Sequence, residues 1–342
     1  MKKNKLLILI LSIALALMLC LSACGNSSSG DNKESDENNQ TKDMPDINIS
    51  VLNGSTGFGI AKLMSDSKTD VTKSHYKFTV ESDASNITAA LINKSIDIAA
   101  LPTNAAANLY QKTNGEIKIL AVNTKGVLYL VCNSEKVAID NISELKGKTV
   151  YCPAQNPTFI FKYLCEKNGL EVGKDVIIDN SYAQPAELRT AIASGLVDIA
   201  VIPEPMVTIA KSANKTLTVS LDLTEEWKKV SETDSLLQGC IVVRTEFAEA
   251  HPDEIKKFLA DYKESVDFTV KNPEQAAVSI AENKIFENKA VASKAIPNCN
   301  ICYIDGEEMQ KSLDEFFSAL YSVAPASIGG KLPDSGIYYT SK

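Results

Sequence analysis

Two successive runs of short apolar segments and amphipathic segments dominate the chain from residue 46 onward. In the first run, strands are predicted at 47–52, 76–80, 96–101 and 117–122, with helices at 59–65, 84–93 and 104–111 between them. The second run predicts strands at 149–152, 175–179 and 199–202, with helices at 157–167 and 185–193. This order predicts an α/β fold in which mostly parallel sheets carry helices on both faces.

An internal repeat relates the two runs. Residues 90–102 align with residues 191–203 at a constant offset of 101, so that Asp97 matches Asp198 and Pro102 matches Pro203. Convergence on one strand–helix unit would produce the same pattern without shared ancestry. In either case the repeat predicts two lobes of similar construction.

The segment after residue 236 has a different pattern. It predicts one strand at 238–243 and then helices at about 252–270, 273–283, 288–295 and 306–322. We expect this segment to return to the first lobe and cover it. The tail, residues 324–342, is rich in Gly, Pro and Tyr, and we expect it to pack as irregular structure.

The N-terminus has the pattern of a secretory signal peptide, residues 1–23. Three lysines precede an apolar run over 6–21, and small residues precede Cys24. The alternative is a permanent transmembrane helix, but the run is short for a span of about 20 residues. Residues 21–24 resemble a bacterial lipobox, which implies lipidation of Cys24. Residues 24–45 are almost entirely polar and predict a flexible tether between that anchor and the folded part.

Charge and composition exclude several partners. The formal net charge is -8, and removing residues 1–23 with their three lysines changes it to -8 - 3 = -11. An acidic chain has no basic face for nucleic acid. Arg189 and Arg244 are the only arginines, so a dense clamp for an anion is not expected. His75 and His251 have no partner at metal-ligand spacing, so we expect no metal site and no cofactor.

No catalytic motif is visible. The chain has no Walker loop, no GxGxxG after a strand and no GxSxG. Cys299 and Cys302 form a single CxxC, the spacing of redox and metal sites, but no second pair and no histidine stands nearby. We interpret them as incidental. Six cysteines follow Cys24, which permits disulfides outside the cytoplasm, although a fold with its own large core does not need them.

Polar loops follow the predicted strands of both runs. Ligands of open α/β sheets bind beyond the carboxyl ends of the strands, where helix N-termini present free N–H groups. The loops at 53–58, 102–104 and 154–158 contain Ser, Thr, Asn and Gln, and the loop at 203–205 holds Glu204 between two prolines. Each such residue alone is also a suitable helix cap, and Phe58 is equally suited to core packing. Several polar loops that face one cleft favour ligand binding.

The ordered set of motifs resembles one protein family. The motifs are the lipobox, Gly54-Ser-Thr-Gly57, Asp97-Ile-Ala-x-x-Pro102, Leu145-Lys-Gly-Lys148 and Pro203-Glu-Pro205. Over residues 46–323 the chain resembles the solute-binding proteins of ABC importers for nitrate, sulfonates, taurine and thiamine-pyrimidine precursors. The resemblance implies a type II periplasmic-binding-protein fold. Its lobes would comprise 46–125 with 236–323, and 126–235, joined by two crossover strands near 122–131 and 236–243.

The resemblance also implies a function. A monomeric lipoprotein on the outer face of the cell membrane would capture a small organic solute between its lobes and deliver it to an ABC permease, without catalytic residues. The residues that would line the cleft are Asn53, Ser55, Thr56, Gly57, Phe58, Thr103, Asn104, Asn156, Thr158 and Glu204. The scarcity of arginine departs from the sulfonate and nitrate binders and places an anionic solute in doubt.

Two alternatives remain open at this stage. One is a ligand-sensing lipoprotein that transports nothing. The other is an enzyme similar to thiamine-pyrimidine synthases, which share the fold. Those enzymes carry a cysteine-rich segment and active-site histidines, and neither is visible in this sequence.

Overall fold

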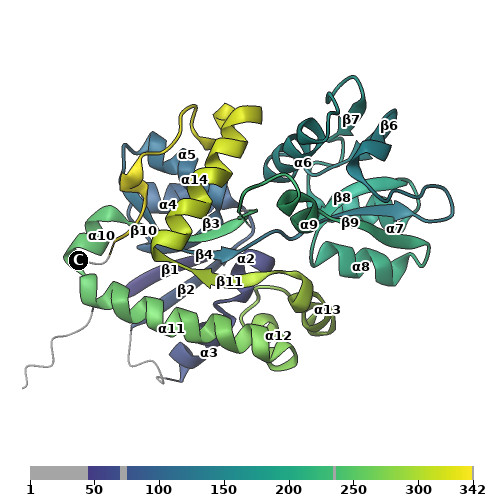
Figure 1. The fold of residues 1–342 in the computed structure, drawn as a ribbon. Coiled ribbons are helices and arrows are strands. Elements are labelled where there is room, and N and C mark those ends of the chain that lie inside the picture. Colours follow the sequence, from purple (N-terminus) through teal and green to yellow (C-terminus); the bar gives the residue numbers. More distant parts are fainter. Residues whose placement is uncertain (1–44, 70–74, 234–235, 341–342) are drawn as a thin grey trace, which may run out of the picture. The chain divides into compact units, whose positions relative to one another are not determined.

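Two β-sheets organise the part of the chain that the computed structural model describes, residues 45–69, 75–233 and 236–340 (Figure 1). The predicted signal peptide, Cys24 and nearly all of the predicted tether lie outside these residues. Contacts join residues 44–342 into a single unit, so that both sheets belong to one body.

The first sheet has six strands in the order β11-β4-β10-β3-β1-β2. β1, β2 and β3 are parallel, whereas β10 runs antiparallel between β3 and β4. The strands are β1 Ile47–Leu52, β2 Tyr76–Glu81, β3 Ile98–Pro102, β4 Ile117–Thr124, β10 Gly239–Arg244 and β11 Ile301–Ile304. We call this sheet and the helices packed on it the first lobe.

The second sheet has five strands in the order β7-β6-β8-β5-β9, with β5 antiparallel to both of its neighbours. The strands are β5 Leu128–Asn133, β6 Lys148–Tyr151, β7 Val176–Asp179, β8 Ile199–Pro203 and β9 Leu217–Asp222. This sheet and its helices form the second lobe. Its strand order reproduces β2-β1-β3-β10-β4 of the first sheet, so the prediction of two lobes with mostly parallel sheets is confirmed. The exact limits of the lobes remain a prediction.

The helices of the first lobe are α2 Ser55–Phe58, α3 Ala61–Lys68, α4 Ala84–Ile92 and α5 Thr103–Lys112. Those of the second lobe are α6 Asn156–Lys167, α7 Pro185–Ala193, α8 Met206–Ala213 and α9 Leu223–Lys228. The C-terminal helices are α10 Thr245–Ala250, α11 Pro252–Lys271, α12 Pro273–Glu282, α13 Lys289–Ala295 and α14 Gly306–Val323.

The repeated aspartate has the same place in both sheets. Asp97 directly precedes β3, and its carboxylate accepts hydrogen bonds from the Asn48 backbone N–H (2.9 Å) and from Arg244 on β10 (2.7 Å). Asp198 directly precedes β8 and pairs with Lys136 at 2.9 Å. In the first lobe this carboxylate ties the start of β3 to the antiparallel strand β10. In the second lobe it ties the start of β8 to the turn that follows the antiparallel strand β5.

The chain passes between the sheets twice, once between β4 and β5 at 125–127 and once between α9 and β10. The two crossings pack against each other. A Cβ on Gly126 would lie 2.2 Å from Thr224 Oγ1 and 2.7 Å from Leu236 Cδ2, so only glycine fits there. The Val127 N–H also donates to the side-chain oxygen of Gln238 at 2.6 Å.

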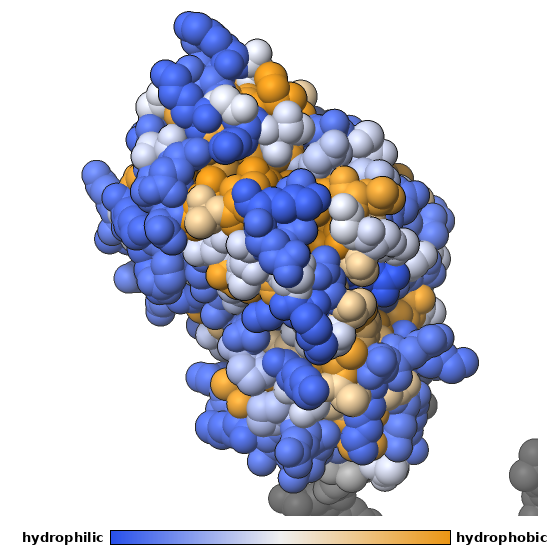
Figure 2. Space-filling model, turned by 90° about the vertical axis from the view of Figure 1, so that its right-hand side faces the viewer, coloured by the Kyte–Doolittle hydropathy of each residue, from blue (hydrophilic) through white to orange (hydrophobic). Residues whose placement is uncertain are grey.

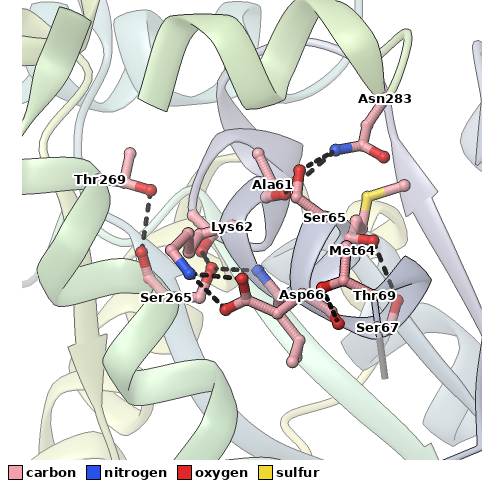
Figure 3. Close-up of polar contacts among 12 residues, drawn as sticks. Ala61, Lys62, Met64, Ser65, Asp66, Ser67, Thr69, Ser265, Thr269 and Asn283 are labelled. Atoms are coloured by element: carbon pink, nitrogen blue, oxygen red, sulfur yellow. Dashed lines mark hydrogen bonds and ion pairs between the residues drawn. The ribbon is translucent and has the colours of Figure 1, made fainter. Parts of the chain in front are cut away.

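The C-terminal helices return to the first lobe, as expected, and fix α3 through a polar network (Figure 3). The buried Ser265 hydroxyl on α11 donates to the Gly59 carbonyl at 2.7 Å and accepts from the Leu63 N–H at 3.0 Å. The Asn283 amide donates to the Ala61 carbonyl at 3.1 Å. These bonds hold the chain immediately after α2, and therefore fix the loop at the carboxyl end of β1.

The tail is more regular than the sequence predicts. It contains two 3-10 turns, Pro325–Ile328 and Ser335–Ile337. Ile337 and Tyr338 are buried, and the Tyr339 N–H donates to the Ile119 carbonyl at 3.0 Å beside β4. The apolar residues of the tail therefore extend the core of the first lobe.

Candidate functional site

The predicted polar loops lie where parallel strands end and helices begin. β1 leads into α2, β3 continues directly into α5, β6 precedes α6 and β8 precedes α8. Because the parallel strands of each sheet run in one direction, these helix starts gather at one edge of each sheet. This is the edge at which α/β proteins bind ligands.

A cavity of about 470 Å³ is lined by residues from both lobes. The first lobe contributes one side of α4 and of α5 along their whole length, Asp83 before α4, and residues 326–327 of the tail. The second lobe contributes Gln155 and Phe159 at the start of α6. The volume is in the range of sites for small molecules.

Asn104 lies in the wall of this cavity with an unsatisfied amide oxygen. Its side chain belongs to the first turn of α5, the residue is 8% exposed, and Oδ1 has no hydrogen-bond partner among the described residues. Asn156, in the first turn of α6, is also 8% exposed, and its Oδ1 likewise has no hydrogen-bond partner among the described residues. An unsatisfied buried polar atom costs about 1–3 kcal/mol. Two of them, Asn104 in the cavity wall and Asn156 directly after the cavity residue Gln155 in the chain, favour a site that a ligand or a lobe movement completes.

Glu204 is a buried carboxylate at the end of β8, and the residue is 4% exposed. It accepts hydrogen bonds from the Thr208 backbone N–H at 3.1 Å and from the Thr208 hydroxyl at 2.9 Å, both in α8. Burial raises the pKa of the Glu204 carboxyl above its ordinary value, while these hydrogen bonds act in the opposite direction. The carboxylate is thus already engaged by its own helix.

Three other predicted site residues make their contacts inside the first lobe. Thr103 is fully buried, and its hydroxyl donates to the Leu237 carbonyl at 2.6 Å. Phe58 is fully buried and packs edge-on against Phe286, with ring centroids 6.1 Å apart. A Cβ on Gly57 would lie 2.5 Å from the Leu52 carbonyl oxygen, so this glycine permits close packing of α2 on β1. A ligand contact at Gly57 stays a prediction from the sequence.

The remaining predicted residues occupy other places. Asn53 lines a different cavity, of about 700 Å³, beside β2. Thr158 donates to the Pro153 carbonyl at 2.8 Å and accepts from Asn180, which stabilises its own loop. Ser55 and Thr56 are half-buried in α2. Of the ten residues predicted to line the cleft, Asn104 is the one that lines this cavity.

The sequence did not predict two residues of the cavity wall, Gln155 and Phe159. Gln155 belongs to a loop that it did identify, but the side chain there has no distinguishing pattern. Phe159 had a signal, because it stands 101 residues after Phe58, and 101 is also the offset of the internal repeat. The structure gives the two phenylalanines different roles, one in the core and one in the cavity wall.

The charged groups of this cavity are Asp83 and Lys112 among the described residues. The Asp83 carboxylate accepts from the Ser85 N–H at 2.8 Å, and this hydrogen bond lowers its pKa. Neither arginine lines the cavity: Arg244 pairs with Asp97, and Arg189 is on α7. The wall therefore offers amides, hydroxyls and apolar surface, with no guanidinium for an anion.

No disulfide joins the described cysteines. Cys299 is buried, and burial raises the pKa of its thiol well above the ordinary value. A thiol that stays protonated is a poor nucleophile and a poor metal ligand. Within residues 45–69, 75–233 and 236–340, no group of His, Cys, Asp and Glu is arranged to hold a metal ion. Over the same residues, no helix has the length and apolar character to cross a membrane.

Comparison with known proteins identifies relatives of this arrangement. A family described as NMT1/THI5-like matches residues 77–276, more than half of the chain. No curated protein matches.

Solved structures share the fold. An ABC transporter protein from Parabacteroides distasonis is 24% identical with a TM-score of 0.70, covering 87% of this chain and 99% of its own. The periplasmic aliphatic sulphonate-binding protein SsuA from Escherichia coli is 17% identical with a TM-score of 0.69, covering 86% and 92%. The alkanesulfonate-binding protein SsuA from Xanthomonas axonopodis pv. citri, bound to MOPS, is 15% identical with a TM-score of 0.62, covering 85% and 96%. At these identities the likeness confirms the predicted periplasmic-binding-protein fold.

Proposed function

Because the chain belongs to the NMT1/THI5-like family, we propose that it is the substrate-binding lipoprotein of an ABC importer. It captures a small organic solute between its lobes and delivers the solute to a membrane permease. The observation that carries this proposal is the cavity of about 470 Å³ lined by both lobes, with the unpartnered Asn104 amide in its wall. A ligand that touches both lobes stabilises one arrangement of them, which a permease can recognise.

The chemistry of the cavity wall favours a neutral or zwitterionic solute. Amide and hydroxyl groups make directional hydrogen bonds without a net charge, and Phe159 supplies an aromatic surface. The relatives from Escherichia coli and Xanthomonas are named for sulfonates. Here both arginines are outside the cavity, so a sulfonate would have to rely on helix N-termini and Lys112.

We keep Asn104 and Asn156 as direct ligand contacts and add Gln155 and Phe159 to them. Glu204 and the loop at 53–58 are proposed to shape the cleft around these four. For Ser55, Thr56 and Thr158, a ligand contact remains a prediction from the sequence.

The proposed location is the outer face of the cell membrane, with a lipid on Cys24. This location is supported by the signal-peptide pattern before Cys24 and by the similarity to the periplasmic protein from Escherichia coli. A monomer is proposed as well; on the face drawn in Figure 2, hydrophilic residues predominate and apolar residues lie between them. A stable homodimer usually buries a broader apolar area.

An enzymatic role receives less support from this chain. The family includes synthase-like members, so membership alone does not decide between a binding protein and an enzyme, and the residues of this chain have to be considered. His75 and His251 are not among the residues of the cavity between the lobes, and the buried Cys299 thiol has a raised pKa. A sensor that passes the bound state to a partner other than a permease would use the same cavity.

A thermal-shift screen of the full chain in detergent tests the proposal. The probes are cytosine, thymine, amino acids and polyamines, compared with taurine and methanesulfonate. Binding to the folded state raises stability by about 2.7 kcal/mol at a ligand concentration of one hundred times Kd. A dose-dependent rise with an uncharged or zwitterionic probe that lacks a sulfonate supports the proposal. A rise with methanesulfonate alone would contradict the proposed solute class.

A further inference from the structure

Besides the two crossings, two of the contacts that the described residues make between the lobes differ in chemical character. The first contact is apolar. Trp227 of α9 is fully buried, with its ring 4.6 Å from that of Tyr163 on α6 and 5.6 Å from that of Phe316 on α14. These residues belong to one continuous core that includes residues of both sheets.

The second contact is polar and joins β5 and α8 to the segment after α13. The Tyr129 hydroxyl, at the start of β5, donates to the Asn298 carbonyl at 2.8 Å. The Asn298 side chain also lies beside the Glu204 carboxylate at the end of β8, where it opposes the rise that burial causes in the pKa of that carboxyl. In Figure 1, α13 of the first lobe and α8 of the second are neighbours on this side of the molecule.

The same segment also holds the first crossing. The Lys125 N–H donates to the Asn300 carbonyl at 3.0 Å, and the Asn300 amide donates to the Gly126 carbonyl at 2.5 Å. The Glu204 N–H donates to the Val127 carbonyl at 2.9 Å. Residues 298–300 of the first lobe thus contact the crossing and the second lobe together.

The two contacts differ in how easily they separate. Opening the aromatic contact would expose the large apolar surface of Trp227 and its neighbours to water. Opening the polar contact exchanges a few hydrogen bonds for bonds to water, and each such bond contributes little net stability. A movement of the lobes that pivots on Trp227 and separates at Asn298 is therefore the least costly.

We propose that Tyr129 and Asn298 are positioning residues that form an interlobe latch. By holding α8 beside α13, they keep the cavity walls on α4, α5 and α6 in register, and breaking the latch lets the lobes open about the aromatic contact. This proposal does not depend on which solute binds or on whether the protein transports it.

A distance measurement without any solute tests the latch. Spin labels are attached through p-acetylphenylalanine at Ser212 on α8 and Lys294 on α13, so that free thiols stay unlabelled. Both positions are exposed. Tyr129→Phe removes the hydroxyl donor and retains the ring. Electron–electron resonance on the full chain is expected to show the ratio of longer to shorter distances rising about fivefold, as the loss of one hydrogen bond allows.

Tyr163→Phe is the matched control, because it makes the same change at the aromatic contact and leaves the latch intact. It should leave the distance distribution unchanged. A merely structural role of Tyr129 would lower the melting temperature without moving the distances, and that result would overturn the proposal. If Tyr129→Phe fails to fold, Tyr129→Met, which likewise has no hydroxyl to donate to the Asn298 carbonyl, decides: longer distances support the latch, and an unchanged distribution refutes it.

Discussion

Asn104 and Gln155 line the same cavity, one from the first turn of α5 in the first lobe and the other from the residue that precedes α6 in the second. The pair defines the site more sharply than any loop motif does, because it requires both lobes. It also indicates what each side chain contributes. Asn104 carries an amide oxygen that is buried without a partner, so its replacement separates a role in binding from a role in folding.

Asn104→Ala is expected to weaken binding of the best compound from the screen about tenfold, as the loss of one to two hydrogen bonds implies. The same change should leave the melting temperature of the free protein nearly unchanged, because it removes a buried acceptor that has no partner. Isothermal titration calorimetry and thermal unfolding measure the two effects. Asn86→Ala, at an exposed position of α4 outside the cavity, is the control. Loss of stability without loss of affinity would assign Asn104 to folding.

The sequence predicted the architecture well where local pattern and long-range structure agree. The strands β3 and β8 both follow an aspartate and end at a proline, and the apolar run between those residues admits one interpretation. The prediction omitted α8, β9 and α9, which follow one another over residues 206–228 with few turn residues between them. Periodicity has little to mark a boundary in such a stretch.

The site was harder to predict for a physical reason. A threonine at the start of a helix has the same local sequence whether it faces a ligand or the core. Thr103 donates to the carbonyl of Leu237, which is 134 residues away, and no local pattern reports that partner. Conversely, Gln155 enters the cavity wall because α6 meets the first lobe, which is a property of lobe packing.

The repeated aspartates provide a second test, since the same position is buried in one lobe and exposed in the other. The side chains of Arg244 and Asp97 are 14% and 8% exposed, whereas those of Lys136 and Asp198 are 53% and 39% exposed. Arg244→Met should lower the free energy of unfolding by about 3 kcal/mol, because it leaves the Asp97 carboxylate buried without its ion pair. Lys136→Met should cost under about 1 kcal/mol, as exposed pairs do.

Urea unfolding followed by circular dichroism measures both free energies. Each variant serves as the control for the other, because each substitution removes the cation that pairs with the repeated aspartate. Equal losses would mean that burial does not distinguish the two pairs.

The lipid anchor is a separate prediction, which concerns residues outside those that the structure describes. Cys24→Ala removes the thiol that lipidation requires, so the protein should leave the membrane fraction or remain uncleaved with its signal peptide. Cell fractionation and the mass of the mature chain distinguish these outcomes. Cys20→Ala is the control, because Leu19 before it does not fit the lipobox pattern. Unchanged membrane association of the Cys24 variant would refute lipidation at this residue.

The last prediction concerns the pH dependence of stability that Glu204 imposes. Burial raises the pKa of this carboxyl in the folded protein above 4.5, so the folded state binds the proton more tightly than the unfolded state does. The stability that this group contributes is therefore fully present below pH 4.5 and is lost as the pH rises through the raised pKa of the folded state. Glu204→Gln keeps the shape and an acceptor for Thr208 but cannot ionise. Relative to wild type, it should gain stability with rising pH over this window.

Urea unfolding from pH 4 to pH 7 measures the difference between the two proteins. Glu225→Gln, at an exposed position of α9, controls for the loss of one negative charge from an acidic protein. If the difference between wild type and Glu204→Gln does not change across the window, then the Thr208 hydrogen bonds fully offset the burial of the carboxylate. In that case the pKa of Glu204 is the same in the folded protein as in the unfolded chain, and the carboxylate beside Asn298 is ionised at neutral pH.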